Sequence, residues 1–178
     1  SLIEQTAYNH YEIVLVDAGS RDPAMAEWLT AMAQLGGAML RVLPYVGPHS
    51  QAALINSAAS QARGDYLLLL NPGALICSGD WLDELLNQAQ RPEVGVVGAR
   101  ILATDGSILH AGQVLGMAGP ASSPFVGEAM DARGYMQRLQ VVQNWSAVSG
   151  DCLMVRKEVF DSLGGLDAQA FADELGAT

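Results

Sequence analysis

Residues 13–20 read IVLVDAGS and residues 66–73 read YLLLLNPG, and each is a short apolar run that stops on a polar loop. Continuous apolar runs of this length are typical of buried parallel strands, because helices cover both faces of such a sheet. In open α/β sheets, ligands bind in the crevice outside the carboxyl ends of the strands. We therefore expect the loops that follow these two strands to mark a ligand site.

Helical and extended patterns alternate around these two stretches. Asp22 and Ser50 can each cap a helix, and a third helix is expected to start at Asp80. The first helix carries an apolar stripe that we assign to core packing: Met25, Trp28, Leu29, Met32 and Leu35. Strands are expected at residues 11–17, 38–43, 66–70 and 94–102, with a two-residue hairpin turn at 105–106 leading to an antiparallel strand at 108–111. Residues 66–70 are the strand expected to be most buried.

The rest of the chain has a different texture. Residues 112–134 are rich in glycine, proline, serine and alanine, which predicts a long loop of the functional or mobile kind. Regular structure is expected again in residues 140–149, in the apolar run 152–155 and in a helix at 157–163. The whole pattern predicts one α/β domain of β-α-β-α-β-α-β order, followed by a partly antiparallel section.

Composition excludes several classes of protein. The 178 residues include nine basic and nineteen acidic side chains, for a net charge of −10, which argues against nucleic acid or anionic membrane as a general partner. The longest apolar runs are far below the ~18 residues that a membrane span needs, and residues 1–6 (SLIEQT) have no basic start of a signal peptide. Cys77 and Cys152 are interpreted as buried free thiols in a reducing compartment, so we expect a cytoplasmic location.

Several catalytic motifs are absent from the sequence. It contains no G-x-G-x-x-G after a strand, no phosphate-binding G-x-x-x-x-G-K-S/T loop, no H-E-x-x-H and no G-x-S-x-G. His10, His49 and His110 are scattered along the chain, and a lone histidine is more often structural than catalytic. A catalytic triad or a zinc site therefore has little support.

Several segments together resemble family-two glycosyltransferases. Residues 16–20 (VDAGS) resemble the family's V-D-D/N-G-S signature, and residues 62–72 (ARGDYLLLLNP) resemble its A-R-G-E-Y-L-L-F-L strand before the D-x-D loop or its L-N-P-D variant. Residues 144–156 (NWSAVSGDCLMVR) resemble N-Y-S-A-V-T-G-A-C-L-L-V-R. Further matches lie at residues 80–82, 94–100, 105–112, 159–160 and 164–167. Their order along nearly the whole chain is that of the polysaccharide and O-antigen branch of the family.

This resemblance implies the GT-A fold, in which a Rossmann-like, mostly parallel sheet flanked by helices is joined to an antiparallel acceptor-side section. It implies a nucleotide-sugar half at about residues 1–111 and an acceptor-side half at about 112–178. The implied activity is transfer of a sugar, a hexose or deoxyhexose, from a UDP- or dTDP-linked donor to a saccharide acceptor, with inversion at the anomeric carbon.

The resemblance also assigns site residues. The nucleotide-sugar set is Asp17, Gly19, Ser20, Arg63, Asn71 and Gly73, and the acceptor-side set is Trp145, Ser149, Gly150 and Asp151. Each role has a structural alternative. Asp17 either accepts a hydrogen bond from a base N–H or only caps its turn, and Ser20 fits a turn or helix start better than a ligand contact. Arg63 either neutralises phosphate or is a solvated cation at a helix end. Trp145 either stacks on a sugar or packs in the core. Asp151 stands where the family prefers a small residue, and is either a substrate contact or simply exposed.

The sequence departs from the family at the D-x-D loop. In the family this loop binds Mg²⁺ or Mn²⁺, which bridges the diphosphate. Here the loop reads Asn71-Pro72-Gly73, so both acids are missing and we expect no metal site in it.

Both ends of the chain indicate a piece of a longer protein. The family's first strand would precede Ser1, and the E-D-x-D segment that supplies the general base would follow residues 164–167. Asp173 and Glu174 are either that segment or part of an acidic loop, and we expect the base beyond Thr178 and residues 1–178 alone to be inactive. Three hypotheses follow: an inverting glycosyltransferase, a non-catalytic GT-A-like scaffold that has lost its metal site, and an unrelated nucleotide-binding α/β domain.

Overall fold

A computed structural model describes residues 2–48, 50–117 and 119–170. The chain divides into two compact units, and each is described by itself. One unit comprises residues 8–67 and 156–170, and the other comprises residues 2–7 and 68–155. We call them the N-terminal unit and the central unit. The predicted functional halves, 1–111 and 112–178, stay a prediction.

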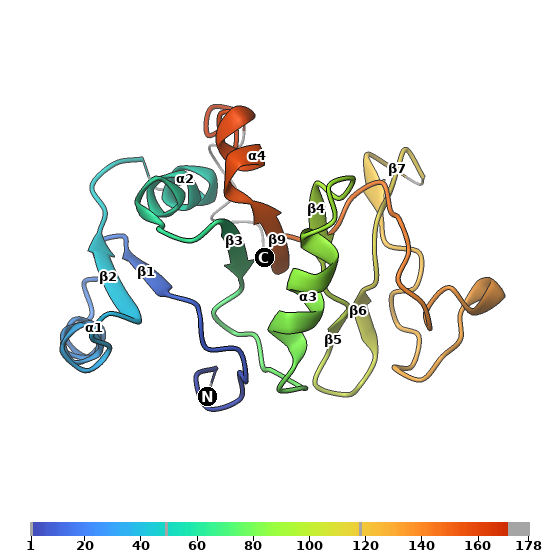
Figure 1. Cartoon of the computed structure of the whole chain (residues 1–178), viewed down its shortest axis with the longest axis horizontal. Coiled ribbons are helices and arrows are strands. Elements are labelled where there is room, and N and C mark those ends of the chain that lie inside the picture. Colours follow the sequence, from blue (N-terminus) through green and yellow to red (C-terminus); the bar gives the residue numbers. More distant parts are fainter. Residues whose placement is uncertain (1, 49, 118, 171–178) are drawn as a thin grey trace. The chain divides into compact units, whose positions relative to one another are not determined.

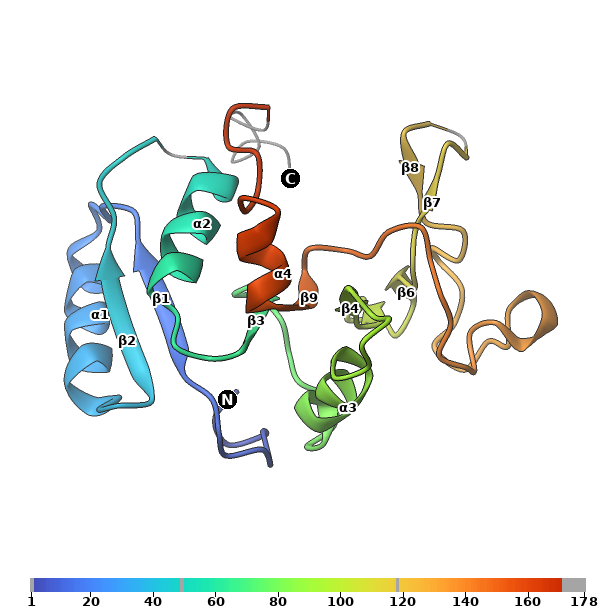
Figure 2. The same cartoon turned by 45° about the horizontal axis from the view of Figure 1, so that its top comes forward.

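The N-terminal unit is a parallel strand pair between helices (Figure 1). Strand β1 (Ile13–Asp17) pairs in parallel with β2 (Leu40–Pro44), and Asp17 is in register with Pro44. Helix α1 (Pro23–Leu35) packs on β2, and α2 (Gln51–Gln61) packs on β1, so the helices flank the pair (Figure 2). The structure therefore confirms the β-α-β-α order that the apolar runs predict, with strand bounds shifted by one or two residues.

Both predicted helix caps are present. The Asp22 carboxylate accepts a hydrogen bond from the Ala24 N–H at 3.0 Å, and the Ser50 hydroxyl accepts one from the Ala53 N–H at 3.2 Å. Pro23 at the first position of α1 has no N–H to satisfy. These contacts are local, which explains why the sequence predicts them correctly.

Helix α4 (Lys157–Ser162) also belongs to the N-terminal unit. The segment after it forms hydrogen bonds with α2. The Asn56 amide donates to the Leu166 carbonyl at 2.8 Å and accepts from the Leu166 N–H at 2.8 Å. A side chain at Gly165 would lie 2.5 Å from the Asn56 amide oxygen, so this close approach needs glycine. The Gly-Gly-Leu-Asp stretch thus has a structural role on α2.

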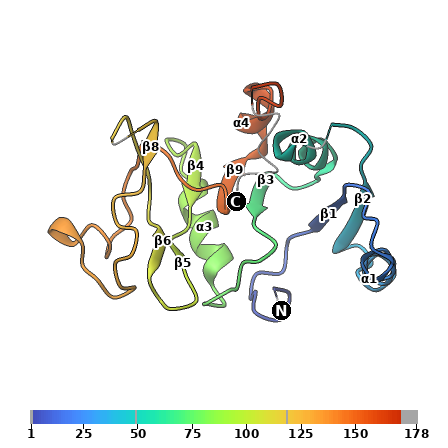
Figure 3. The same ribbon diagram turned by 180° about the vertical axis from the view of Figure 1, so that it is seen from behind.

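The central unit is organised on a three-stranded sheet in the order β3-β9-β4 (Figure 3). Strand β3 (Tyr66–Leu70) enters this unit at Leu68, and β9 (Cys152–Arg156) is antiparallel to β4 (Val96–Gly98). Helix α3 (Trp81–Ala89) packs on β4. The Trp81 indole N–H donates to the Thr6 hydroxyl at 3.0 Å, which ties residues 2–7 to this helix.

Several predictions for the central unit are wrong in detail. Residues 94–102 are not one strand, because β4 pairs with β9 while β5 (Ile101–Leu102) pairs with β6 (Ile108–His110). The antiparallel hairpin is confirmed, but its turn is longer than two residues. The Gly106 N–H donates to the Ala103 carbonyl, and Gly106 is the one residue of residues 103–107 with positive φ. The predicted loop at 112–134 contains the strands β7 (Val114–Leu115) and β8 (Ala121–Ser122).

Two further predictions about order and burial are corrected. Residues 140–149 form no helix or strand apart from a single bridge between Gln113 and Ala147, and a 3₁₀ helix lies instead at Tyr135–Gln137. The prediction that residues 66–70 form the most buried strand is wrong, because β9 is the more buried. In β3, only Leu67 is buried. The long apolar run of β3 did not predict this, because burial depends on remote neighbours.

The apolar stripe of α1 is not a buried core in this structure. No residue of α1 is buried, and Trp28 and Leu35 are 48% and 79% exposed. Helical periodicity shows which side chains share a face, but it does not show that another element covers that face. None of the helices in the described ranges is both long and apolar enough to cross a bilayer.

Candidate functional site

The loop after β1 carries the first predicted site residues. One carboxylate oxygen of Asp17, Oδ1, accepts hydrogen bonds from the N–H groups of Gly19 and Ser20, at 3.1 and 2.9 Å. Gly19 has φ +84°, which glycine adopts without strain. The turn-capping role of Asp17 and the turn role of Ser20 are therefore present in the structure. No described hydrogen bond uses the second oxygen of Asp17, Oδ2, so the carboxylate can still accept from a ligand, and that role stays a prediction.

A surface hollow of about 330 Å³ adjoins this loop. Its wall combines residues 16–20 with Met25 and Leu29 of α1. An oriented carboxylate beside apolar side chains is suited to a flat heterocycle that carries an N–H, because binding sites place few polar groups among apolar walls. The half-exposed stripe of α1 therefore lies next to the predicted nucleotide site.

Arg63 is not brought to the Asp17 loop by any described contact. Its backbone N–H donates to Glu12 Oε1 at 2.6 Å, and the other oxygen of Glu12 pairs with Arg41 at 3.0 Å. The Arg63 residue is exposed. This arrangement is that of a solvated cation after α2, and a phosphate contact by Arg63 stays a prediction.

The loop after β3 is joined to the segment before β9. The Asn71 N–H donates to the Asp151 carbonyl at 2.8 Å, and the Asn71 amide donates to Asp151 Oδ1 at 3.1 Å. The Asn71 amide oxygen accepts from the Gly73 N–H at 2.9 Å, which closes the loop. Ser149 donates to Asp151 Oδ2 at 2.8 Å. Four of the predicted site residues thus meet in the central unit, and Gly150 lies exposed between Ser149 and Asp151.

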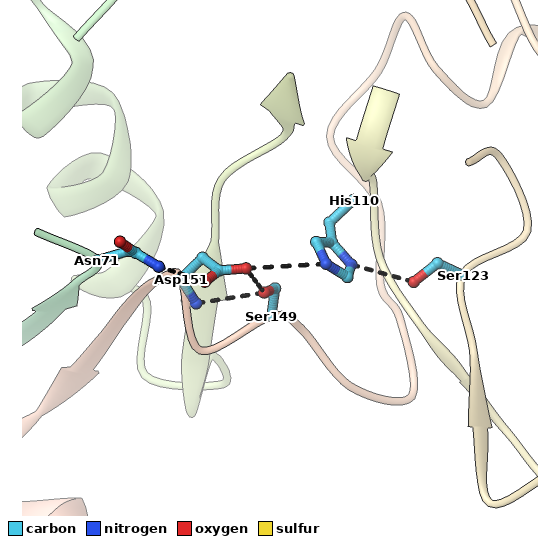
Figure 4. Close-up of polar contacts among 5 residues, drawn as sticks. All are labelled: Asn71, His110, Ser123, Ser149 and Asp151. Carbon is cyan, nitrogen blue, oxygen red and sulfur yellow. Dashed lines mark hydrogen bonds and ion pairs between the residues drawn. The ribbon is translucent and has the colours of Figure 1, made fainter. Parts of the chain in front are cut away.

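Two further side chains complete this arrangement, and the sequence did not single them out for a site. His110 Nε2, at the end of β6, lies 3.7 Å from Asp151 Oδ2, and His110 Nδ1 lies 3.2 Å from the Ser123 hydroxyl (Figure 4). We call the five residues the Asp151 cluster: Asn71, His110, Ser123, Ser149 and Asp151. The one usable signal in the sequence was the position of His110 at the end of the hairpin strand.

The Asp151 cluster holds a carboxylate in its charged form. Hydrogen bonds from Asn71 and from Ser149 lower the pKa of Asp151, and the nearby His110 adds to this effect. The side chain is 39% exposed, so solvent or a ligand can reach it. The serine, histidine and aspartate do not form a nucleophilic triad, because 3.7 Å is too long for the hydrogen bond that would orient the imidazole.

Trp145 is packed on more than one side within the central unit. Phe125 meets the ring edge to face at a centroid distance of 6.0 Å, and the Arg138 guanidinium lies 4.6 Å from the ring centroid. A side chain at Gly112 would lie only 2.2 Å from the indole. These contacts support the packing alternative for Trp145, and stacking on a sugar stays a prediction.

The residues of loop 71–73 do not by themselves fit the divalent cation that the family resemblance implies. Proline and glycine offer no side-chain ligand, and the Asn71 oxygen already accepts from Gly73. Within residues 2–48, 50–117 and 119–170, no group of three or more histidine, cysteine, aspartate or glutamate side chains is arranged to hold a metal. The Asp151 carboxylate lies beside this loop, with Oδ1 3.1 Å from the Asn71 amide nitrogen.

The two loops belong to different compact units, so Asp17 and the Asp151 cluster are described separately. Asp173 and Glu174, considered for the general base, lie outside the described residues. His49 does too.

Comparisons with known proteins agree on the family. The profile of glycosyl transferase family 2 matches residues 1–164. The chain is 40% identical to the O-antigen biosynthesis protein RfbC of Myxococcus xanthus, over 94% of this chain and 13% of that protein. It is 38% identical to the uncharacterized protein y4gI of Sinorhizobium fredii, over 97% of this chain and 19% of that protein. The chain therefore spans less than a fifth of either relative.

A solved structure supports the same fold. The mannosyltransferase PcManGT of Pyrobaculum calidifontis, determined in complex with GDP-Man and Mn²⁺, superposes with a TM-score of 0.65 at 17% identity, over 94% of this chain and 42% of that one. This likeness shows the GT-A type of α/β fold. The match of the family profile along residues 1–164 establishes that the chain belongs to glycosyl transferase family 2.

Proposed function

We propose that the protein containing this chain transfers a sugar from a nucleotide-sugar donor to a saccharide acceptor in the synthesis of a cell-surface polysaccharide. The observation that carries the proposal is the 40% identity to an O-antigen biosynthesis protein over 94% of the chain. The reaction proposed is an inverting transfer, in which the acceptor hydroxyl attacks the anomeric carbon and the nucleoside diphosphate leaves.

The proposed donor is a UDP- or dTDP-sugar, held through Asp17. Uracil and thymine each present one N–H on the pairing edge, and Asp17 Oδ2, which no described hydrogen bond uses, is a carboxylate oxygen at the strand end. The adjoining apolar wall of Met25 and Leu29 suits the face of the ring. A hydrogen bond to a charged group contributes about 1.5–3 kcal/mol, so loss of this acceptor should weaken nucleotide binding by at least about tenfold.

Asp17→Asn tests this role in the intact protein. Asparagine keeps the Oδ1 acceptor that caps the turn, but it replaces Oδ2 with an NH₂ group that cannot accept. Asp22→Asn is the matched control: it removes the same charge from the same unit, and asparagine caps a helix as well as aspartate does. Calorimetry with UDP, dTDP and GDP should show weaker binding only for Asp17→Asn. Equal affinities for both variants and the unchanged protein would refute the Asp17 assignment.

The second candidate function is a non-catalytic GT-A-like scaffold, and the absence of an acid at Gly73 favours it. Turnover distinguishes the two candidates. We expect release of nucleoside diphosphate from a UDP- or dTDP-sugar in the presence of a saccharide acceptor. A folded, intact protein that binds none of these nucleotides supports the scaffold.

A further inference from the structure

We propose that Asp151 and His110 together bind one hydroxyl group of the neutral saccharide that accepts the transferred sugar. The inference rests on the proposed function, because it assigns a contact to the acceptor of that reaction. It gives His110 a ligand-binding role and makes the unusual acid at position 151 a determinant of acceptor specificity. The whole Asp151 cluster lies in the central unit.

The first argument is the distance between the two side chains. His110 Nε2 and Asp151 Oδ2 are 3.7 Å apart, which is too long for a direct hydrogen bond (Figure 4). A polar pair at such a separation is commonly bridged by the oxygen of a water or a ligand. A hydroxyl oxygen can lie about 2.8–2.9 Å from both atoms at once, and these are ordinary hydrogen-bond lengths. The separation is therefore the one that a single bridging hydroxyl requires.

The second argument is the hydrogen-bonding pattern that the pair offers. His110 Nδ1 lies 3.2 Å from the Ser123 hydroxyl, and a serine that donates to Nδ1 leaves the ring proton on Nε2. The pair then presents a donor, Nε2–H, and an acceptor, Asp151 Oδ2. A hydroxyl group accepts and donates at the same time, so it matches both, whereas a carbonyl oxygen matches the donor alone.

The third argument is the free capacity of the carboxylate. Asp151 Oδ1 accepts from the Asn71 amide at 3.1 Å and Oδ2 accepts from Ser149 at 2.8 Å, while an ionised carboxylate has about four acceptor sites. These two donors orient the group without saturating it. The side chains of Asp151 and His110 are 39% and 30% exposed, so a ligand can reach both.

Charge decides which class of ligand fits the pair. Hydrogen bonds from Asn71 and Ser149 lower the pKa of Asp151, and the whole chain has a net charge of −10. An ionised Asp151 repels an anionic group, such as a phosphate or the carboxylate of an acidic sugar. It attracts a neutral O–H donor, because hydrogen bonds to a charged oxygen are among the stronger ones. The pattern and the charge together favour a neutral saccharide.

The experiment combines a change in the protein with a change in the ligand. Methyl α-D-mannoside, methyl β-D-galactoside and their singly deoxygenated analogues are titrated into the intact protein in the presence of UDP or dTDP, and binding is followed by NMR. For the unchanged protein, removal of one particular hydroxyl should weaken binding by at least about tenfold. Asp151→Asn and His110→Phe should weaken binding of the complete glycoside by a similar factor. In these variants, loss of the same hydroxyl should cost little more, since the contact is already absent.

Control variants complete the design. His110→Gln returns an N–H donor and should recover part of the affinity that His110→Phe loses. Asp105→Asn and His10→Phe are the matched controls, because they make the same kinds of change at exposed residues outside the cluster, and both should bind as the unchanged protein does. Asp151→Ser also lacks the carboxylate and gives the same test should Asp151→Asn not fold. A purely structural role of Asp151 would not produce a dependence on one ligand hydroxyl.

The outcomes separate this inference from the proposed function. If Asp151→Asn or His110→Phe binds the glycosides as tightly as the unchanged protein does, the inference is wrong while the proposed function stands. If UDP or dTDP binds but no glycoside does, the inference alone is overturned as well. If neither a glycoside nor a nucleotide binds, the proposed function fails together with the inference.

Discussion

The packing of Trp145 against Gly112 gives a sharp prediction for stability. A Cβ at Gly112 would lie 2.2–2.3 Å from three atoms of the indole. The ring cannot easily move away, because Phe125 and Arg138 lie against it. Gly112→Ala therefore forces a rearrangement of the segment around Trp145.

The cost has two parts. Gly112 has φ +96°, and placing an L-residue in such a left-handed conformation costs about 1–2 kcal/mol. Crowding a well-packed ring costs a further amount of about 1–3 kcal/mol. Together these give a loss of about 2–5 kcal/mol in the free energy of unfolding, which is large for a domain whose total stability is about 5–15 kcal/mol.

Gly116→Ala separates the two parts. Gly116 has φ +75°, and nothing lies within 4 Å of the position of its added Cβ, so only the backbone cost applies. In urea denaturation followed by tryptophan fluorescence and circular dichroism, Gly112→Ala should lower the midpoint more than Gly116→Ala does, with the slope unchanged. In the background of Trp145→Ala, the extra cost of Gly112→Ala should vanish. Equal midpoints for the two glycine variants would show that the ring does not pack on Gly112 as described.

Two pH-dependent predictions follow from groups in the central unit. Cys152 is buried as the sequence predicts, and burial raises the pKa of its thiol to about 11, but the prediction of burial is wrong for Cys77, which is exposed. At pH 8 an alkylating reagent should therefore modify Cys77 quickly and Cys152 only on unfolding, and rapid loss of both thiols would contradict this. The pKa of Asp151 is lowered by hydrogen bonds from Asn71 and Ser149, so its ionised form stabilises the fold above the pKa of the unfolded chain, near 4. Stability should therefore fall as the pH drops below about 4, and the difference in stability between the unchanged protein and Asp151→Asn should shrink in the same range.

The features that the sequence predicted well depend on near neighbours. The caps at Asp22 and Ser50 act on N–H groups two or three residues away, and β1 and β2 are short apolar runs on either side of a capped helix. In each case the residues that decide the structure stand next to one another in the sequence.

The features that the sequence predicted poorly depend on remote partners. Residues 94–102 form one apolar pattern, yet a side chain at Gly98 would lie 2.5 Å from Val148, and the strand stops there. The next strand, β5, takes β6 as its partner instead. Residues 94–102 are divided into two strands because each part pairs with a different partner strand. The periodicity of residues 94–102 does not show which strand will be the partner.

The candidate site shows the same division. The comparison of the sequence with the family pattern singled out Asn71 and Asp151 separately. Asn71 stands where the family's D-x-D loop has an acid, and Asp151 stands where the family prefers a small residue. It passed over His110 and Ser123, because a histidine at a strand end and a serine in a loop carry no distinctive spacing. Only the fold places these four side chains in one cluster.

The identity of residue 71 fits this cluster chemically. An amide at Asn71 donates to Asp151 Oδ1 at 3.1 Å and so favours the ionised carboxylate. An acid at position 71 would instead place two carboxylates at hydrogen-bond distance, where both cannot remain ionised at neutral pH. The asparagine is therefore matched to an acid at 151, and the loss of acids from the loop and the presence of Asp151 are two parts of one electrostatic arrangement. The Gly73 N–H donates to the Asn71 amide oxygen at 2.9 Å, so a neutral contact closes loop 71–73 while the charge lies on the neighbouring segment.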